Sequence, residues 1–460
     1  MVVLLSYLVE LAGIPPRTLA AYLEHRAAGH NSLISGLGNW LGGTLRQLDR
    51  GSASEPLEHA NGLAVTPSPR SAGLLVASSA QAIQAISQAR PGDVITFLPG
   101  HYRFAGKSIP VNQAGLSTAG ITVSALQPET VFLEFDMEEG FLVSVPYWTF
   151  ENLNIRGICR DHSRCEHAFH VVAGAAHFSA KNNYLSDFNA HFKINGADGL
   201  MPDNGLIEGN RLTNSSVRYT ANPVTPIDLV AASHWIIRRN LISDFIKAEG
   251  DQISYGGFAK GAGSGNRFEQ NIVLCEQRLR GQPGQRVGLS LGGGGTGQGV
   301  CRDKRCITEQ DGGVIQSNLI ASCSDDGIYL NRAATSQITH NTLLDTGGIV
   351  VRYPESSADV AGNLVDGAIR SRDGGLLRES DNTATSMTEL YLGRHPVRDL
   401  FVNVSQLNLA WRSDALPRSQ VKYDQPDLCG SKRPAQPMRG AFEDYAACQI
   451  FLVPQSVHTP

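Results

Sequence analysis

The chain has 460 residues, of which 48 are glycine and eight are cysteine, and its formal net charge is −4. The acidic balance argues against a nucleic-acid-binding protein. A length of 460 residues exceeds one ordinary globular core, whereas a repeat protein grows by adding units. The even number of cysteines, with close pairs at 159/165 and 301/306, favours disulfides in an oxidising compartment.

Residues 1–75 are predicted to be a helical segment followed by a linker. Residues 1–14 are apolar but short for a membrane span, contain Glu10 and lack a basic start. They are a candidate membrane tether or trimmed signal, and equally a helix that packs on the end of the fold. With the cysteines, they favour a periplasmic or secreted protein of the cell envelope.

An amphipathic helix is predicted next, beginning near Ser78-Ser79, whose hydroxyls can cap it, with an apolar face from Ala82 to Ala89. Pro91-Gly92-Asp93 then turns the chain into a strand at 94–98. We interpret this helix as a cap, because the end of a solenoid otherwise exposes its core and an unpaired strand edge.

A repeated asparagine follows, each time just before aliphatic residues and at spacings of 27, 30, 31, 47, 23 and 22 residues. Such spacings, with short β-rich runs, indicate a β-solenoid over residues 76–380, with closing coils and a cap at 381–460. Each asparagine is expected at a tight turn, where it tolerates a left-handed backbone and stacks on the next one. The seven are Asn183, Asn210, Asn240, Asn271, Asn318, Asn341 and Asn363.

One further disulfide is suggested by this alignment. Cys275 follows Asn271 by four residues and Cys323 follows Asn318 by five, so we expect a bridge between adjacent coils. Buried free thiols are the alternative. Cys429 and Cys448 could staple the C-terminal segment.

One strand of each repeat has apolar residues on both sides of an outward position. The first outward column is predicted to contain His170, Lys193, Asp228, Ser254, Ser290 and Tyr329. A second column contains Asn195, Asn331 and Arg352, with Arg370 and Arg372 near its end. Long loops at 196–205, 214–226, 276–286 and 292–312 are expected to wall a binding groove. The columns either bind an acidic polysaccharide, with Tyr353 against a sugar, or form an ordinary solvated face.

The segment Pro91-Gly92-Asp93-Val94-Ile95 and the closing Gly440-Ala441-Phe442-Glu443 resemble right-handed parallel β-helix carbohydrate enzymes. These include alginate and chondroitin lyases of the chondroitinase B type. The resemblance implies an all-β, right-handed parallel β-helix with an N-terminal helical cap. The Asp-Pro-His-Asp string of the related mannuronan epimerases is absent.

The resemblance also implies a reaction. In the chondroitinase B type an acidic pair and a residue of the previous coil bind calcium, a lysine is the base and an arginine is the acid. Here Glu249, Asp251 and Asp228 would bind calcium. Lys260 is the nearest candidate for the base and Arg286 for the acid, although both depart from the family's positions. The three carboxylates could instead cap turns.

We therefore predict a lyase that cleaves a uronate-containing polysaccharide by β-elimination. A glycoside hydrolase is one alternative, because Asp325-Asp326-Gly327 resembles the paired acids of inverting polygalacturonases, although a turn role is simpler. A non-catalytic polysaccharide-binding protein is another. The candidate catalytic residues are His170, Lys193, Lys260, Arg286 and Arg352, and the candidate substrate-binding residues are Asn195, Ser290, Tyr329, Asn331 and Tyr353.

Overall fold

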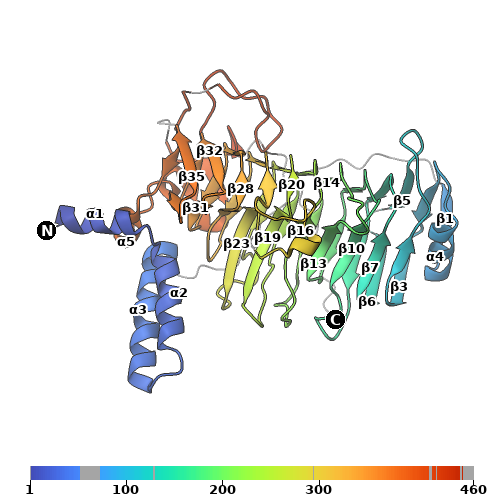
Figure 1. Cartoon of the computed structure of the whole chain (residues 1–460), viewed down its shortest axis with the longest axis horizontal. Helices are drawn as coiled ribbons and strands as arrows, with labels where there is room; N and C mark the ends of the chain where they lie inside the picture. The colour runs from blue at the N-terminus through green and yellow to red at the C-terminus, as the bar shows by residue number, and fades with distance from the viewer. Residues whose placement is uncertain are drawn as a thin grey trace.

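Three long parallel sheets wind around a single core in this computed structural model (Figure 1). The structure describes residues 2–51, 73–127, 130–293, 295–413, 417–420, 422–445 and 448. The chain visits the sheets in turn, so that one coil contributes one strand to each sheet and the strands of successive coils pair in parallel. This topology confirms the predicted all-β parallel β-helix.

The three sheets have twelve, ten and eleven strands. The twelve-stranded sheet consists of β1 (Leu74–Val76), β2 (Val94–Phe97), β5 (Ile121–Ala125), β8 (Trp148–Glu151), β11 (Ser179–Lys181), β14 (Leu206–Glu208), β17 (Ile236–Arg238), β21 (Arg267–Glu269), β25 (Val314–Gln316), β29 (Ser336–Thr339), β32 (Ser357–Ala361) and β35 (Leu376–Ser380). The ten-stranded sheet consists of β4 (Ile109–Val111), β7 (Glu139–Val143), β10 (His167–Val172), β13 (Ala190–Asn195), β16 (Ile227–Val230), β19 (Ile253–Lys260), β23 (Gln285–Leu291), β27 (Ile328–Asn331), β31 (Gly348–Arg352) and β34 (Ala368–Arg372). The eleven-stranded sheet consists of β3 (Gly100–Gly106), β6 (Val131–Met137), β9 (Asn154–Gly157), β12 (Tyr184–Ser186), β15 (Arg211–Thr213), β18 (Leu241–Ser243), β22 (Ile272–Leu274), β26 (Leu319–Ala321), β30 (Thr342–Leu344), β33 (Leu364–Val365) and β36 (Thr383–Ala384).

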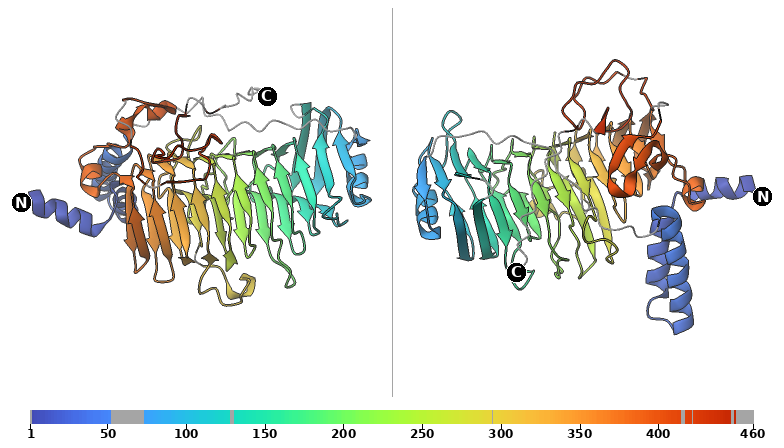
Figure 2. Two further views of the ribbon diagram at one scale, coloured as in Figure 1. Left: turned by 90° about the horizontal axis from the view of Figure 1, so that it is seen from above. Right: turned by 180° about the vertical axis from the view of Figure 1, so that it is seen from behind.

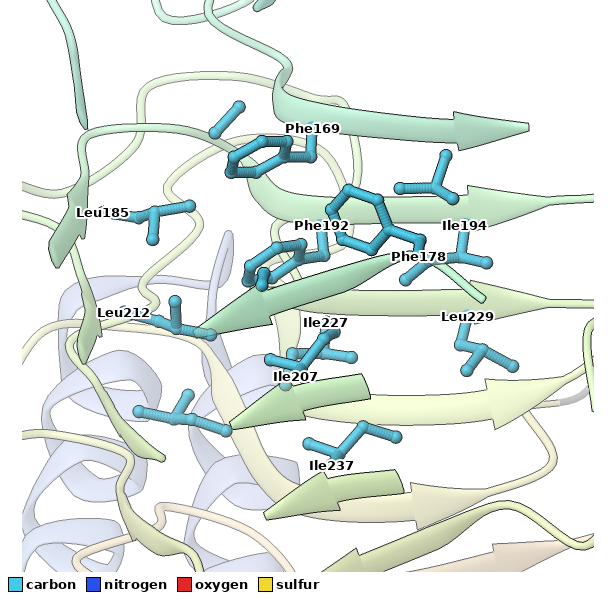
Figure 3. Packing of buried hydrophobic residues seen from close by; sticks show 14 of the residues in the cluster. Phe169, Phe178, Leu185, Phe192, Ile194, Ile207, Leu212, Ile227, Leu229 and Ile237 are labelled. Atoms are coloured by element: carbon cyan, nitrogen blue, oxygen red, sulfur yellow. The ribbon is translucent and has the colours of Figure 1, made fainter. Parts of the chain in front are cut away.

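Apolar side chains stack inside the coils in register (Figure 3). Phe169 lies over Phe192, with ring centroids 5.3 Å apart and planes 7° from parallel, and Phe192 pairs with Ile227 of the next strand. All three side chains are fully buried. Burying a side chain of this size stabilises the fold by about 1.5–3 kcal/mol, so each added coil contributes its own share of the core.

A continuous ladder of buried asparagines runs along one turn of the solenoid, as predicted. Each Nδ2 donates to the Oδ1 of the next asparagine, for example from Asn240 to Asn271 at 3.0 Å and from Asn271 to Asn318 at 3.0 Å. The predicted left-handed backbone belongs to the preceding residue instead. Gln270 has φ +57° and Ser317 has φ +52°. The asparagine itself stays outside that region, because its side chain must point into the stack.

The helices cap both ends of the solenoid. α4 (Ser79–Ser87) covers the first coil, and the Ser78 hydroxyl accepts a hydrogen bond from the Gln81 amide, as predicted. The N-terminal helices α1 (Val2–Ala12), α2 (Pro16–Ala27) and α3 (Ser32–Arg50) lie at the opposite end, beside the last coils (Figure 2). The prediction of an N-terminal cap therefore holds for α4, whereas α1 to α3 belong to the C-terminal end.

Buried charges attach α2 and α3 to the late coils. Arg17 is buried, forms an ion pair with Asp49 and donates to the carbonyl oxygen of Cys323 at 2.6 Å. Arg50 pairs with Asp345 at 3.1 Å. Removing one partner of a buried pair leaves an uncompensated charge, which explains why these helices are held at one place on the solenoid.

α1 contacts a short helix at the same end, α5 (Met387–Tyr391). The Glu10 carboxylate accepts hydrogen bonds from the amides of Met387 and Thr388. Within the described residues, none of the helices is both long and apolar enough to cross a bilayer. The membrane tether stays a prediction.

The C-terminal segment packs along the outer face of the eleven-stranded sheet. It contains the hairpin of β37 (Phe401–Asn403) and β38 (Asn408–Trp411), with the short turns η3 (Arg398–Leu400) and η4 (Val404–Gln406). Phe401 and Phe442 pack in one cluster with Leu319, Leu344 and Leu364 of the sheet. The outer face of that sheet is therefore covered in this region.

All eight cysteines form disulfides: Cys159–Cys165, Cys275–Cys323, Cys301–Cys306 and Cys429–Cys448. The predicted bridge between adjacent coils, Cys275–Cys323, is confirmed. Four disulfides are typical of a protein that folds in an oxidising compartment outside the cytoplasm.

Candidate functional site

The two polar columns lie on the outer face of the ten-stranded sheet. The strand register aligns the first outward column as Leu142, His170, Lys193, Asp228, Phe258, Ser290, Tyr329, Val350 and Arg370. Five of the six predicted members are confirmed in this column. The sixth is wrong, because Phe258 of β19 takes the place predicted for Ser254.

The register of β19 has a packing cause. β19 is eight residues long, and its inward positions next to Phe258 are Gly257 and Ala259. A Cβ at Gly257 would lie 3.1 Å from the Phe268 ring, so that ring fills the interior where other coils use a large aliphatic residue. Ser254 lies four residues earlier, is buried, and pairs with Arg286.

The second outward column contains Asn195, Val230, Lys260, Asn331, Arg352 and Arg372. Lys260 joins this column because of the corrected register of β19. Arg370 belongs to the first column, where it pairs with Val350. Lys260 and Lys193 therefore flank β16, on the strands either side of Asp228.

Lys193 and Asp228 form an ion pair on adjacent strands. The Lys193 ammonium lies 2.8 Å from Asp228 Oδ2, and the Lys193 side chain is 25 % exposed. Asp228 is almost fully buried, and its other carboxylate oxygen has no hydrogen-bond partner within the described part of the chain. A buried carboxylate needs a positive partner, and Lys193 provides it while its own head stays within reach of solvent.

Lys260 has a different environment. Its ammonium group lies over the ring of Phe258, 4.2 Å from the centroid, and forms no ion pair within the described part of the chain. Burial lowers the pKa of Lys260, and Lys193 lowers it further, against the opposing effects of Asp228 and Glu309. A desolvated lysine of this kind can lose its proton and act as a base.

A glycine-rich segment closes over Lys260. A Cβ placed on Gly293 would lie 2.8 Å from Lys260 Cδ and 3.7 Å from its Nζ. Glu309, buried nearby, accepts a hydrogen bond from the Thr296 hydroxyl at 2.7 Å and so holds the segment down. Gly293 therefore leaves the room that the Lys260 side chain occupies.

His170 begins the polar part of the first column. Its Nδ1 lies 2.7 Å from Glu139 Oε1, and its Nε2 lies 2.7 Å from Asn195 Oδ1. His167 is on the same strand, and its ring centroid lies 5.3 Å from that of His170. The two histidines hold the pKa of Glu139 well below its usual range.

Sequence reasoning missed Glu139 and His167. The run Glu139-Gly140-Phe141-Leu142-Val143 pairs directly with β10, and its apolar alternation matches that of Phe169-His170-Val171. Extending the repeat alignment by one coil toward the N-terminus would have brought Glu139 next to His167.

The remaining predicted binding residues lie toward the C-terminal end of the face. Tyr329 accepts hydrogen bonds from Asn331 Nδ2 and Arg352 Nη1, both at 3.2 Å. Arg352 also stacks over Tyr353, 4.4 Å from the ring centroid, and pairs with Asp373. Ser290 is fully buried and donates to the Gly292 carbonyl oxygen, so it does not present its hydroxyl to a substrate.

Arg286 lies away from this face. Its side chain is 2 % exposed, and its guanidinium pairs with Glu276 at 2.7 Å and donates to the carbonyl oxygens of Gln282 and Pro283. It organises the 276–286 loop. The sequence alignment predicted Arg286 in the site because it took Ser254, and not Phe258, as the outward residue of β19.

The three carboxylates predicted to bind calcium do not converge. Asp228 is paired with Lys193, whereas Asp251 is paired with Lys247 at 2.7 Å. Glu249 is exposed on the turn before β19. Asp228 is the register partner of Phe258, whereas Glu249 and Asp251 precede the first residue of β19, Ile253. Phe258 lies five residues beyond Ile253, which is about 16 Å along the strand. The three residues therefore do not fit one calcium ion together.

A second acidic site adjoins Tyr329. Burial and the neighbouring Asp326 raise the pKa of Asp325 to about 7. Asp326 forms an ion pair with Arg370 at 2.7 Å. Asp325 is thus partly protonated near neutral pH, and it lies beside an aspartate that pairs with Arg370.

At each end of the strands of this sheet, a disulfide-closed loop contacts a second long loop. The Cys159–Cys165 loop precedes β10 and contacts the 214–226 loop, where the Tyr219 amide donates to His162 at 3.0 Å. The Cys301–Cys306 loop follows β23, and Arg302 forms a bidentate pair with Asp203 of the 196–205 loop at 2.7 and 2.8 Å. The two disulfide loops therefore flank opposite ends of the strands.

No protein-family model and no curated protein sequence matches the chain. Several solved structures are similar to it. Pectate lyase Pel9A is 15 % identical, covering 78 % of this chain and 90 % of its own, with a TM-score of 0.49. A Geobacillus virus E2 protein, ORF18, is 12 % identical, with coverages of 77 % and 63 % and a TM-score of 0.46. An alginate lyase from Paenibacillus sp. strain FPU-7 is 11 % identical, with coverages of 68 % and 99 % and a TM-score of 0.36.

Proposed function

We propose that the chain is a polysaccharide lyase that cleaves a uronate-containing polymer by β-elimination. The observation that carries the proposal is Lys260, a largely buried lysine with no ion-pair partner in the described structure, on a polar outer face. A base for this reaction must lose its proton near working pH, and burial lowers the pKa of Lys260 toward that condition.

The reaction assigns a step to each group. The Lys260 amine takes the C5 proton of a uronate unit, the C5–H electrons form the C4=C5 double bond, and the C4–O bond breaks. The Lys260 ammonium formed in this way then returns the proton to the departing oxygen. Lys193 lies two strands away and attracts the carboxylates of the polymer, because its ammonium is partly exposed.

The direct test is the ultraviolet absorbance of the C4–C5 unsaturated product. The full chain is incubated with alginate, pectate, chondroitin sulfate, dermatan sulfate, hyaluronan and glucuronan. Absorbance that rises on one polymer supports elimination and names the substrate. Folded protein that gives a flat trace on every polymer overturns the proposal, and polymer binding without cleavage would then favour a non-catalytic role.

Calcium dependence stays a prediction, and the same absorbance assay tests it. Activity is measured with added calcium and after treatment with a calcium chelator. Because Asp228, Glu249 and Asp251 are held apart, we expect the Asp251→Ala variant to behave as the wild type does with calcium and with chelator. A response lost in that variant would restore the predicted ligand set.

The second candidate is a glycoside hydrolase, which the Asp325–Asp326 pair favours. Hydrolysis needs one protonated and one ionised carboxyl group. Since the pKa of Asp325 is raised to about 7, we expect hydrolytic activity to fall as pH rises through about 7. The measurement is reducing-end release without ultraviolet absorbance, with Asp325→Asn as the inactive variant. A rate that is independent of Asp325 would remove this candidate.

The same shift predicts a trend in stability. Asp325 has a pKa of about 7 in the folded chain and 3.8 ordinarily, so its favourable contribution is complete below pH 3.8. That contribution is lost as pH rises through 7. The free energy of unfolding of the wild-type chain should therefore fall, relative to Asp325→Asn, between these values.

A further inference from the structure

Glu139, His167 and His170 form a cluster of ligand atoms on the first polar coils. One oxygen of Glu139 and one ring nitrogen of each histidine lie within 4.8 Å of one another. Among the residues that the structure describes, this is the one group of three that could hold a metal ion. Each side chain is between 16 % and 18 % exposed, so the cluster is sheltered yet reachable.

The backbone explains why the three meet. Glu139 of β7 is the register partner of His167 of β10, and Leu142 is the partner of His170. Gly140 lets the two strands approach, since a Cβ there would lie 2.4 Å from the Ala168 carbonyl oxygen. A larger residue at position 140 would push apart the strands that bring the ligands together.

Asn195 determines which His170 nitrogen is free. Asn195 Nδ2 donates to the Gly196 carbonyl oxygen at 3.1 Å, which turns its Oδ1 toward His170 Nε2 at 2.7 Å. His170 must therefore donate from Nε2, and its Nδ1 faces Glu139 Oε1 at 2.7 Å. Two electron pairs at that distance require a proton or a metal ion between them. A metal-ligating histidine usually donates its other N–H to an oxygen in this way.

The position of His167 favours a metal ion over a proton between His170 and Glu139. Its Nδ1 is buried, has no hydrogen-bond partner among the residues that the structure describes, and lies 3.7 Å from the same Glu139 oxygen. One proton between His170 and Glu139 leaves that nitrogen unsatisfied, whereas a metal ion would bind all three atoms. Ligands about 2.0–2.2 Å from a tetrahedral ion lie about 3.3 Å apart, and the observed 2.7 and 3.7 Å bracket this spacing.

We propose that Glu139, His167 and His170 bind a divalent transition metal of the zinc class. Two imidazole nitrogens and one carboxylate suit zinc, whereas calcium prefers oxygen ligands. Three protein ligands leave one tetrahedral position open for water or for an anionic oxygen of a ligand. The site joins β7 to β10, and its existence does not depend on lyase activity.

The metal is separate from the proposed base. His170 lies on β10 and Lys260 on β19, three strand spacings apart, which is about 14 Å. An ion here cannot touch the sugar unit that Lys260 deprotonates. Through its open position it would hold a more distant anionic group of a bound polymer.

The test is zinc binding to the full oxidised chain, measured by calorimetry after chelator treatment, with cobalt absorption spectra to report nitrogen ligands. We expect one zinc ion per chain with a micromolar or lower Kd, and an unfolding temperature that rises with zinc. His167→Ala and Glu139→Gln should each weaken binding by more than about 100-fold, and Asn195→Ala by about 10- to 100-fold. Because every cysteine is in a disulfide, thiolates do not compete for the ion.

The matched control is His177→Ala, an exposed histidine that stacks on Tyr147 outside the cluster. It should bind zinc as the wild type does. Glu139→Gln preserves side-chain shape, so it remains informative if the histidine variants fail to fold. The proposal is overturned if the wild type binds no zinc at micromolar concentration, or if folded His167→Ala and Glu139→Gln bind it as well as the control.

Discussion

Replacing Lys260 by methionine is expected to reduce the eliminative activity by about 100- to 10,000-fold, the usual contribution of a positioned general base. Methionine keeps a long apolar side chain at this position but has no amine to accept the C5 proton. The variant should be at least as stable as the wild type, because a charge that burial disfavours has been removed. The measurement is the initial rate of product absorbance, beside thermal unfolding.

Lys107→Met is the control for this variant, since Lys107 is exposed and lies far from Lys260 along the solenoid. It should retain full activity. An active Lys260→Met enzyme would exclude Lys260 as the base and would leave Lys193 as the next lysine to replace.

The pH dependence of the wild type supplies a second readout. A lysine base works in its neutral form, so the rate should rise as Lys260 loses its proton. Burial lowers the pKa of Lys260 below its ordinary 10.5, so that rise should occur below pH 10.5. Stability should follow the same direction, because between the folded and ordinary pKa values the unfolded chain binds more protons. Both trends should be absent from Lys260→Met.

Asn271→Ala is expected to destabilise the chain by about 3–6 kcal/mol, through several buried polar groups that each cost about 1–3 kcal/mol unpaired. The Asn271 amide donates to the Ile237 carbonyl oxygen at 2.9 Å and to Asn318 Oδ1 at 3.0 Å. Its oxygen accepts from the backbone and side-chain nitrogens of Asn240. Urea unfolding of wild type and variant measures the loss.

Asn382→Ala tests whether the interior of the ladder matters. Asn382 ends the ladder, is partly exposed, and donates to the Val360 carbonyl oxygen. Water can replace its bonds, so we expect less than half the loss seen for Asn271→Ala. Equal losses in the two variants would show that the asparagines act singly and not as a buried stack.

Much of the outer face could be predicted because repeats impose register. Once one strand per coil was recognised, the alternation of inward and outward side chains placed His170, Lys193, Asp228 and Tyr329 in one column. The Cys275–Cys323 bridge followed from the same alignment. These predictions use only local pattern and the fixed spacing of parallel strands.

The alignment was wrong where packing between sheets chose the register. In β19 the triplets around Ser254 and Phe258 both fit an outward centre, and the second prevails because Phe268 of another sheet occupies the interior beside Gly257. That choice brings Lys260 onto the outer face and leaves Arg286 buried with Glu276. A local sequence pattern does not show that the ring of a residue in a different sheet fills the interior at this position.

The sequence by itself determined the coil: its period, its asparagine ladder, its cap at Ser78 and the polarity of its outer columns. All of these arise from short-range geometry repeated along the chain. Only the tertiary structure placed α1 to α3 against the last coils, where Arg17 and Arg50 meet Asp345, and joined Glu139 to His167 and His170. Such contacts form between segments that are far apart in the sequence and are buried together only in the folded molecule, where each buried charge needs a partner.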